Sequence, residues 1–240
     1  MKKSSVKLSK KDLALWAAVW LLILIAFFMT FLRTPEQITA TLMKATREMS
    51  ALAVINHALL LVVLAAGLVF KKARNILFAS YLSYISLSAL VVSIVFMIVP
   101  NIIIFAMFLL MILWAYRQKR LNFEIKSTAD IRLLFAAIGI LFGFWYLHWV
   151  ESPVALNAFV FSPLGIVNCP TMAMTCGFLC LVRKPRSVLL ESVVAIVTLY
   201  FGFFGLFRLG AYVDVALVIC ALFLILRVGS SLDHDKVFGQ

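Results

Sequence analysis

Apolar segments long enough to cross a membrane recur along the whole of this 240-residue chain. Hydrophobic residues make up 65% of the sequence, charged residues make up 13%, and the mean hydropathy is +1.09. A bilayer core about 30 Å thick is crossed by about 20 helical residues, and backbone groups in lipid must be paired within their own segment. The sequence therefore predicts an all-α, polytopic membrane helix bundle that forms a single membrane domain over residues 1–240.

Eight segments have the apolarity of a membrane span. They cover residues 13–32, 51–70, 76–99, 101–116, 133–150, 165–182, 187–207 and 211–227. Little of the chain is left between them, so a separate soluble domain is not expected. The residues between the first two spans are predicted to form a long outer loop.

Basic residues are distributed unevenly between the two sides of this arrangement. With the N-terminus inside, all but four of the 22 Lys and Arg residues fall in inner segments, the exceptions being Arg33, Lys44, Arg47 and Arg208. This bias follows the positive-inside rule and predicts a bacterial inner-membrane protein with both termini in the cytoplasm. The net charge of +12 is thereby explained by topology, and no nucleic-acid partner is expected.

Two stretches 112 residues apart resemble one another. Residues 55–74 and 167–186 each carry polar residues at their second and third positions, then an apolar run, then a basic cluster, so that Asn56 matches Asn168 and His57 matches Cys169. This predicts two parallel repeats of four spans, residues 1–120 and 121–240, related by an axis along the membrane normal. Chance is the alternative, because apolar spans that end in Lys or Arg look alike for topological reasons.

Polar residues within or beside the spans gather toward the outer face. Ionisable groups are costly in lipid and often functional, so we expect a ligand-binding site open to the outer face from a group of seven residues: Asn56, His57, His148, Glu151, Asn168, Cys169 and Asp214. Simpler readings exist for several of them. A single His often only packs, His148 sits among interfacial aromatic residues, and Arg208 with Asp214 is read as an ordinary ion pair. Glu191 is expected to snorkel toward the inner surface or to pair with Arg186 or Arg183.

The sixth span carries sulfur-containing residues on one helical stripe. Cys169, Met172, Cys176 and Cys180 fall within an arc of about 80° at 100° per residue. Thiols and thioethers are ligands for soft ions, so Cys169, Met172 and Cys176 are a candidate site for a metal such as copper. The alternative is that they are apolar filling in a buried helix.

Helix-breaking residues surround the first of these cysteines. Pro163, Gly165 and Pro170 lie close together, and proline removes a backbone donor and disrupts the preceding turn. We therefore expect residues 157–170 to enter the bilayer as broken structure that lines a cavity, with Cys169 facing protein or water. In the fifth span Gly139 and Gly143 have the G-x-x-x-G spacing of close helix packing.

The run F-S-P-L-G-I-V-N-C-P-T-M at 161–172, followed by R-K-P-R and two spans, resembles an uncharacterised family of small bacterial multi-pass membrane proteins. That family is catalogued only as a domain of unknown function with a Cys-Pro-Thr element in a late span. The resemblance covers the last third of the chain and marks Cys169, Pro170 and Thr171 as family-defining positions. It implies a membrane location and no particular activity.

Three classes of function remain open. The first, which we favour, is a small transporter or ligand-binding membrane protein for a soft metal ion or small solute, with a site built from Asn56, His57, Asn168 and Cys169. The second is a redox or cofactor-binding protein with His57 and His148 as haem ligands or Cys169 as a redox thiol, for which the evidence is thinner. The third is an accessory subunit whose partners are lipid, other membrane subunits or a second copy. No nucleophile–base pair is visible in the sequence, so hydrolytic chemistry is not expected.

Overall fold

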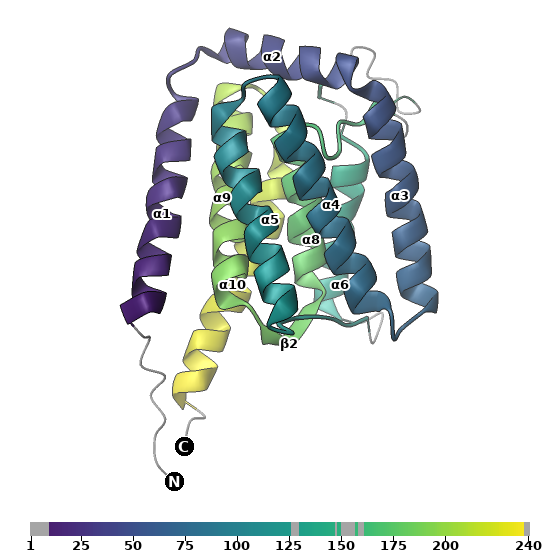
Figure 1. Ribbon diagram of the computed structural model, residues 1–240, viewed down its shortest axis with the longest axis vertical. Helices are drawn as coiled ribbons and strands as arrows, with labels where there is room; N and C mark the ends of the chain where they lie inside the picture. The colour runs from purple at the N-terminus through teal and green to yellow at the C-terminus, as the bar shows by residue number, and fades with distance from the viewer. Residues whose placement is uncertain (1–9, 126–129, 147, 150–156, 158–160, 238–240) are drawn as a thin grey trace.

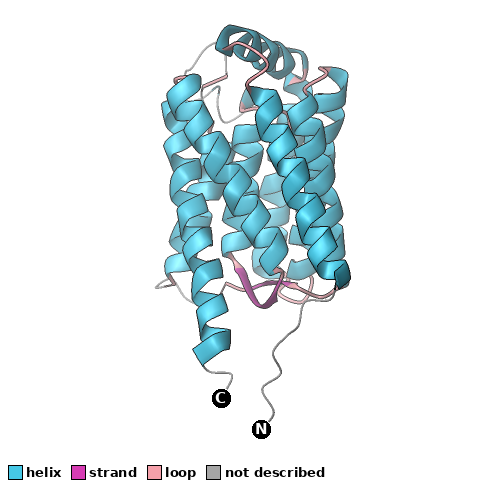
Figure 2. Cartoon of the chain, turned by 90° about the vertical axis from the view of Figure 1, so that its left-hand side faces the viewer, coloured by secondary structure: helices cyan, strands magenta, loops and turns pink. Residues whose placement is uncertain are grey.

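The computed structural model describes residues 10–125, 130–146, 148–149, 157 and 161–237. Most of these residues are helical, as the apolar composition predicts. Most of the helices run side by side to form a bundle, and α2 lies across its upper end in the view of Figure 1. Two short strands lie at the opposite end (Figure 2).

The first half of the chain forms five helices. They are α1 (Lys10–Thr30), α2 (Pro35–Glu48), α3 (Ser50–Val69), α4 (Arg74–Val95) and α5 (Val99–Arg117). A strand, β1 (Leu121–Phe123), follows α5. Each of the first four predicted spans thus overlaps a helix.

The second half contains shorter helices in its centre. The described elements are α6 (Ile131–Phe144), α8 (Asn168–Cys180), β2 (Val182–Arg186), α9 (Val188–Arg208), the 3-10 turn η1 (Tyr212–Asp214) and α10 (Val215–Val237). Both α6 and α8 are shorter than predicted, with 14 and 13 residues. At 1.5 Å per residue each is about 20 Å long, so neither would cross a bilayer core as a helix alone.

Five of the described helical segments are long and apolar enough to span a membrane. These are α3, α4, α5, α9 and residues 212–230, and the number rises to six if α1 and α2 are counted as one bent span. The structure therefore shows a helical bundle with several candidate spans. The topology of eight spans and the two repeats of four spans each remain predictions. The outward faces carry exposed apolar side chains, among them Val62, Leu110 and Leu226, which suits a lipid environment.

Helix α2 replaces the outer loop that was expected between the first two spans. It is bent by 103° from α1 and begins with a capping box, in which the Thr34 side chain and the Gln37 side chain each bond the other residue's backbone N–H. On the helix itself, Leu42 and Ala45 are buried, whereas Lys44 and Glu48 form an exposed ion pair. The expectation of a loop was wrong. The residues are too polar to be recognised as a membrane span, but the run T-P-E-Q at 34–37 is a helix start signal, and a helix forms after it.

Helix α8 lies in the middle of the bundle, where every one of its residues is buried. It packs against α4, α6, α9 and α10. The closest packing is with α6, where a Cβ placed on Gly139 would lie 2.6 Å from the Ala173 carbonyl oxygen and one on Gly143 would lie 2.7 Å from the Pro170 oxygen. The predicted packing role of the G-x-x-x-G pair is confirmed.

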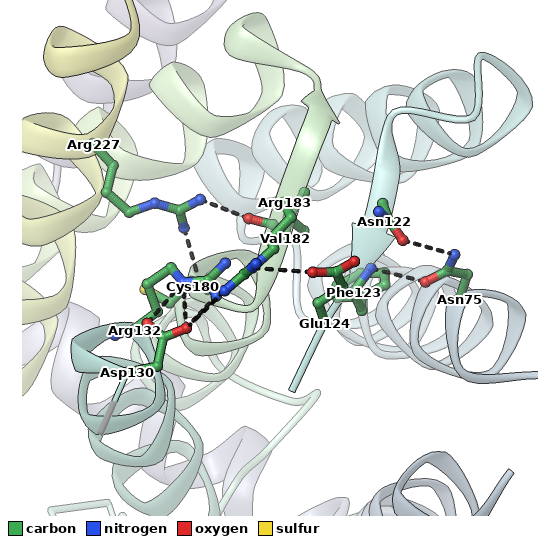
Figure 3. A network of polar contacts seen from close by, with 10 residues as sticks. All are labelled: Asn75, Asn122, Phe123, Glu124, Asp130, Arg132, Cys180, Val182, Arg183 and Arg227. Carbon is green, nitrogen blue, oxygen red and sulfur yellow. Dashed lines mark hydrogen bonds and ion pairs between the residues drawn. The ribbon is translucent and has the colours of Figure 1, made fainter. Parts of the chain in front are cut away.

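The end of the bundle opposite α2 is closed by the two strands and a set of charged side chains (Figure 3). Strand β1 pairs antiparallel with β2, and Asn122 opposes Arg183. Arg183 forms ion pairs with Glu124 at 3.1 Å and Asp130 at 3.3 Å. Helices α8 and α9 are therefore tied to the loop between α5 and α6.

Two further arginines complete this end of the bundle. The Arg227 guanidinium donates to the carbonyl oxygens of Leu179, Cys180 and Val182 at 2.6 to 3.0 Å, which satisfies backbone acceptors at the end of α8. The predicted pairing of Glu191 is confirmed for Arg186, at 3.4 Å. Both partners are buried, with side chains 1% and 8% exposed.

Candidate functional site

The chain is non-helical and buried over residues 162–167, immediately before α8. This segment makes a tight turn in which Ile166 and Val167 donate to the Pro163 oxygen, each at 3.1 Å. Gly165 has φ +70°, a conformation that glycine adopts without strain. Of the broken segment predicted for residues 157–170, the structure shows 162–167 as non-helical. The expectation was wrong for its last three residues, because α8 begins at Asn168 and Pro170 lies in its first turn, where a missing backbone N–H costs no helical hydrogen bond.

Side chains from α3 and α4 satisfy the backbone of this break. Asn56 Nδ2 donates to the Leu164 oxygen at 2.7 Å, and Ser88 Oγ donates to the Gly165 oxygen at 2.8 Å. Tyr84 donates to Asn56 Oδ1 at 2.8 Å. Because unpaired backbone groups are costly in a low-dielectric interior, Asn56 and Ser88 act here as structural ties.

His57 supports the neighbouring helix end in a similar way. Its Nε2 lies 3.0 Å from the Phe144 oxygen, at the last residue of α6. The ring also packs edge-on against the Phe144 ring, with centroids 4.7 Å apart. The side chain is buried, so the simpler of the two sequence readings, a packed and hydrogen-bonded histidine, describes its observed contacts.

A second polar cluster lies at the start of α8. Cys169 Sγ donates to Asp214 Oδ2 at 3.2 Å, and the Tyr146 hydroxyl donates to Asp214 Oδ1 at 2.6 Å. Asp214 is fully buried in η1, and Cys169 is 2% exposed. The thiol, the carboxyl group and the phenol come from three separate segments that meet only in the folded chain.

The expected ion pair between Arg208 and Asp214 is absent, and that reading was wrong. Arg208 instead donates to the Arg33 oxygen at 3.0 Å and lies 4.8 Å from the Phe31 ring centroid. It therefore joins the end of α9 to the link between α1 and α2. Asp214 turns inward because Tyr146 and Cys169 provide its hydrogen-bond donors.

A cavity of about 130 Å³ lies under α2 and reaches this cluster. Its wall is mostly apolar, with Ile38 and Leu42 from α2 and Phe201 and Phe204 from α9. Polar side chains line parts of it: Thr30, Arg33, Thr41, Asn101, Asn168 and Cys169. The cavity thus has the composition of many ligand sites, apolar surface with a few polar groups.

Asn101 is the most informative of these polar residues. It lies near the start of α5, is only 2% exposed, and its Nδ2 has no hydrogen-bond partner within the described residues. Buried amide groups are normally paired, because leaving one unsatisfied costs about 1–3 kcal/mol. Asn101 therefore lines the cavity and carries a buried amide donor that no described residue satisfies.

The structure distributes the residues predicted for the site among different places. Asn168 and Cys169 line the cavity, whereas Asn56 and His57 tie down the backbone of the break and the end of α6. His148 is exposed, with its ring against Trp149. Glu151 lies outside the described residues. Of the four residues predicted to build one site, the structure thus places two, Asn168 and Cys169, on the cavity wall.

The candidate metal site gains no support from the geometry. Across the described ranges no three His, Cys, Asp or Glu side chains are placed to hold a metal ion. The Cys169 thiol donates a hydrogen bond to Asp214. Cys176 is seven residues further along α8, within the buried core. The four cysteines are free thiols, and the reading of Met172 and Cys176 as apolar filling describes their full burial.

Three elements of the site were missed from the sequence. Residues of α2 were assigned to a loop, and neither Asn101 nor Tyr146 was singled out. A signal existed for α2 in its capping box. The sequence carries no signal for the hydrogen bond between Cys169 and Asp214, which are 45 residues apart.

Comparison with known families, curated proteins and solved structures finds no match to this chain. The resemblance of the Cys169-Pro170-Thr171 element to an uncharacterised membrane family therefore remains a prediction. The function must be argued from the cavity and the residues around it.

Proposed function

We propose that this chain is a multi-pass membrane protein that binds a small, largely apolar solute in the cavity under α2, as a permease or ligand-binding protein would. The observation that carries the proposal is the side chain of Asn101, which lines the apolar cavity and whose buried Nδ2 has no partner among the described residues. Asn168 and Cys169 add polar atoms to the same wall. A solute with an apolar body and one hydrogen-bond acceptor complements this lining.

The charge distribution supports an outward-facing position for this cavity. The described basic residues of the inner segments, such as Arg132, Arg183 and Arg227, lie around the two strands, at the end opposite α2 (Figures 2 and 3). Basic residues favour the cytoplasmic side. The end that carries α2 then faces outward, and a solute would reach the cavity from the outer face.

The amphipathic character of α2 suits a cover at the membrane surface. Leu42 and Ala45 face the protein, and Lys44 and Glu48 face away from it. The helix is joined to α1 through the sharp bend. A movement of α2 about this bend would open the cavity without disturbing the core around α8.

The size of the cavity limits the solute. An engineered cavity of about 150 Å³ in another protein accommodates benzene, so a volume of about 130 Å³ favours a molecule of similar size. Phenol combines such a ring with a hydroxyl oxygen that can accept from Asn101. We therefore choose phenol as the probe.

Protection of Cys169 from a thiol reagent tests the proposal. The purified chain in detergent is treated with N-ethylmaleimide, with and without phenol, and modified cysteines are located by peptide mass spectrometry. Cys169 should react first, because it lines the cavity while Cys176, Cys180 and Cys220 are fully buried. Phenol should slow the reaction at Cys169.

The three buried cysteines serve as internal controls in this experiment. A general effect of phenol on the detergent or the fold would change their labelling as well. Phenol that leaves Cys169 labelling unchanged, or that slows all four cysteines equally, would count against a binding site under α2.

A further inference from the structure

The cluster of Cys169, Asp214 and Tyr146 has the arrangement of an activated nucleophile. The thiol donates to one carboxylate oxygen at 3.2 Å, and the phenol donates to the other at 2.6 Å. A nucleophile within hydrogen-bond reach of a base, with a third group orienting that base, is the general pattern of covalent catalysis. Solute binding alone does not require such an arrangement.

The position of Cys169 on its helix adds to this pattern. It is the second residue of α8, a helix of 13 residues. The first N–H groups of a helix have no partner within it, and the helix dipole places partial positive charge there. The helix end favours negative charge on the sulfur, whereas the burial of Cys169 and the adjacent Asp214 carboxylate oppose it. The thiol therefore needs Asp214 to take its proton when it attacks.

The fold makes specific room for the carboxyl group beside the cavity. A Cβ at Gly205 would lie 1.7 Å from Asp214 Oδ2, so a side chain there would displace the carboxyl group. Gly205 and Cys169 both line the cavity. The thiol therefore stands at the wall of a space that a substrate could occupy, and the buried Asp214 carboxyl group is hydrogen-bonded to it.

The cavity itself suits an acyl group. Its apolar wall can hold a short hydrocarbon chain. Asn101 lines the same cavity, and its Nδ2 donor, which has no partner among the described residues, would reach a carbonyl oxygen after a rotation of its side chain. Such a donor stabilises the negative charge that develops on the oxygen when a thiolate attacks the carbonyl carbon. Asn101 is independent of the cysteine cluster, because it belongs to α5.

We propose that Cys169 is an acyl-accepting nucleophile that reacts with acyl thioesters. Asp214 takes the proton of the thiol, and Cys169 Sγ forms a bond to the carbonyl carbon. The bond between this carbon and the donor sulfur breaks, and the departing thiolate receives the proton from Asp214. The products are an acylated Cys169 and a free thiol, and no oxidant or reductant is needed.

The test uses S-hexanoyl-N-acetylcysteamine, a small thioester, with the full chain in detergent. Intact mass should rise by one hexanoyl group, peptide mapping should place it on Cys169, and hydroxylamine should remove it. Asp214→Asn keeps the size of the side chain and removes the base, so acylation should slow by about 10²–10⁴-fold. Cys176→Ser, a change in the buried core away from the cavity wall, should leave the rate unchanged.

A second variant distinguishes loss of the base from a folding defect caused by the substitution of Asp214. Asn101→Leu removes the carbonyl donor from another helix, and acylation should slow by about 10²–10³-fold. Hexanoyl groups found only on other residues, or equal rates in native protein, Asp214→Asn and Asn101→Leu, would overturn the proposal. Phenol protection of Cys169 without any acylation would reject this chemistry while leaving solute binding supported.

Discussion

Asn56 and Leu164, 108 residues apart, are joined by a 2.7 Å hydrogen bond from the Asn56 amide to the Leu164 backbone oxygen. The bond holds a buried, non-helical segment against α3. Together with the bond from Ser88 to Gly165, it fixes the point at which α8 begins. The position of Cys169 on the cavity wall depends on this tie.

Replacement of Asn56 should destabilise the fold. Asn56→Leu fills a similar volume but leaves the Leu164 oxygen and the Tyr84 hydroxyl without their partner, at a cost of about 1–3 kcal/mol. Ser83→Ala is the control, because the Ser83 hydroxyl donates to the Ala79 oxygen of its own helix and to no other described residue. Thermal unfolding in one detergent compares them, and similar midpoints for the two variants would argue against the tie.

Substitution of Gly139 tests the contact between α6 and α8. In Gly139→Ala the new methyl group would lie 2.6 Å from the Ala173 oxygen and 2.7 Å from the Gly177 Cα. The helices must separate, and overpacking of this kind costs about 1–3 kcal/mol. Gly229→Ala in α10 meets no atom within 4 Å and should be neutral or slightly stabilising. A Gly139 variant as stable as the Gly229 variant would contradict the close packing.

The sequence predicted the general architecture well, because apolar composition and helix length act locally. All eight predicted segments overlap helices, and the proline and glycine residues marked the break before α8. The site was predicted less well. The hydrogen-bond partners of Asp214 are Tyr146 and Cys169, which lie on other segments. Local sequence patterns do not predict which distant residues come into contact.

Asp130 should make stability depend on pH at the end of the bundle that carries the strands (Figure 3). Hydrogen bonds from Arg132, and a weaker one from Arg183, hold the pKa of Asp130 below its ordinary value. A carboxyl group with a depressed pKa in the folded state stabilises the fold above its unfolded pKa, about 4. This contribution is lost as the pH falls below that value.

The comparison that isolates this effect is native protein against Asp130→Asn. The variant should be less stable than native protein at pH 7, and the difference should shrink as the pH is lowered from 5 toward 3, roughly across the Asp titration range. Unfolding midpoints in detergent at each pH provide the measurement. A difference that stays constant with pH would mean that the Asp130 charge contributes nothing.

The proposed topology places α2 outside and both chain ends inside. Reporter fusions after Gln240 and after Lys44 on the exposed face of α2 test it, using alkaline phosphatase, which is active outside, and green fluorescent protein, which fluoresces inside. Fluorescence at Gln240 and phosphatase activity at Lys44 are expected from the positive-inside rule. Phosphatase activity at Gln240 would contradict the proposed orientation and the outward-facing cavity.

In the proposed function, Asn101 gives the apolar cavity its preference for a solute with a hydrogen-bond acceptor. The most direct test of this claim is calorimetric titration of phenol and benzene into native protein and Asn101→Leu, with empty micelles as the blank. Loss of one buried hydrogen bond, about 1.4 kcal/mol, should lower the affinity ratio of phenol to benzene roughly tenfold in the variant. A ratio that is the same in both proteins, or heats no larger than those of empty micelles, would contradict the claim.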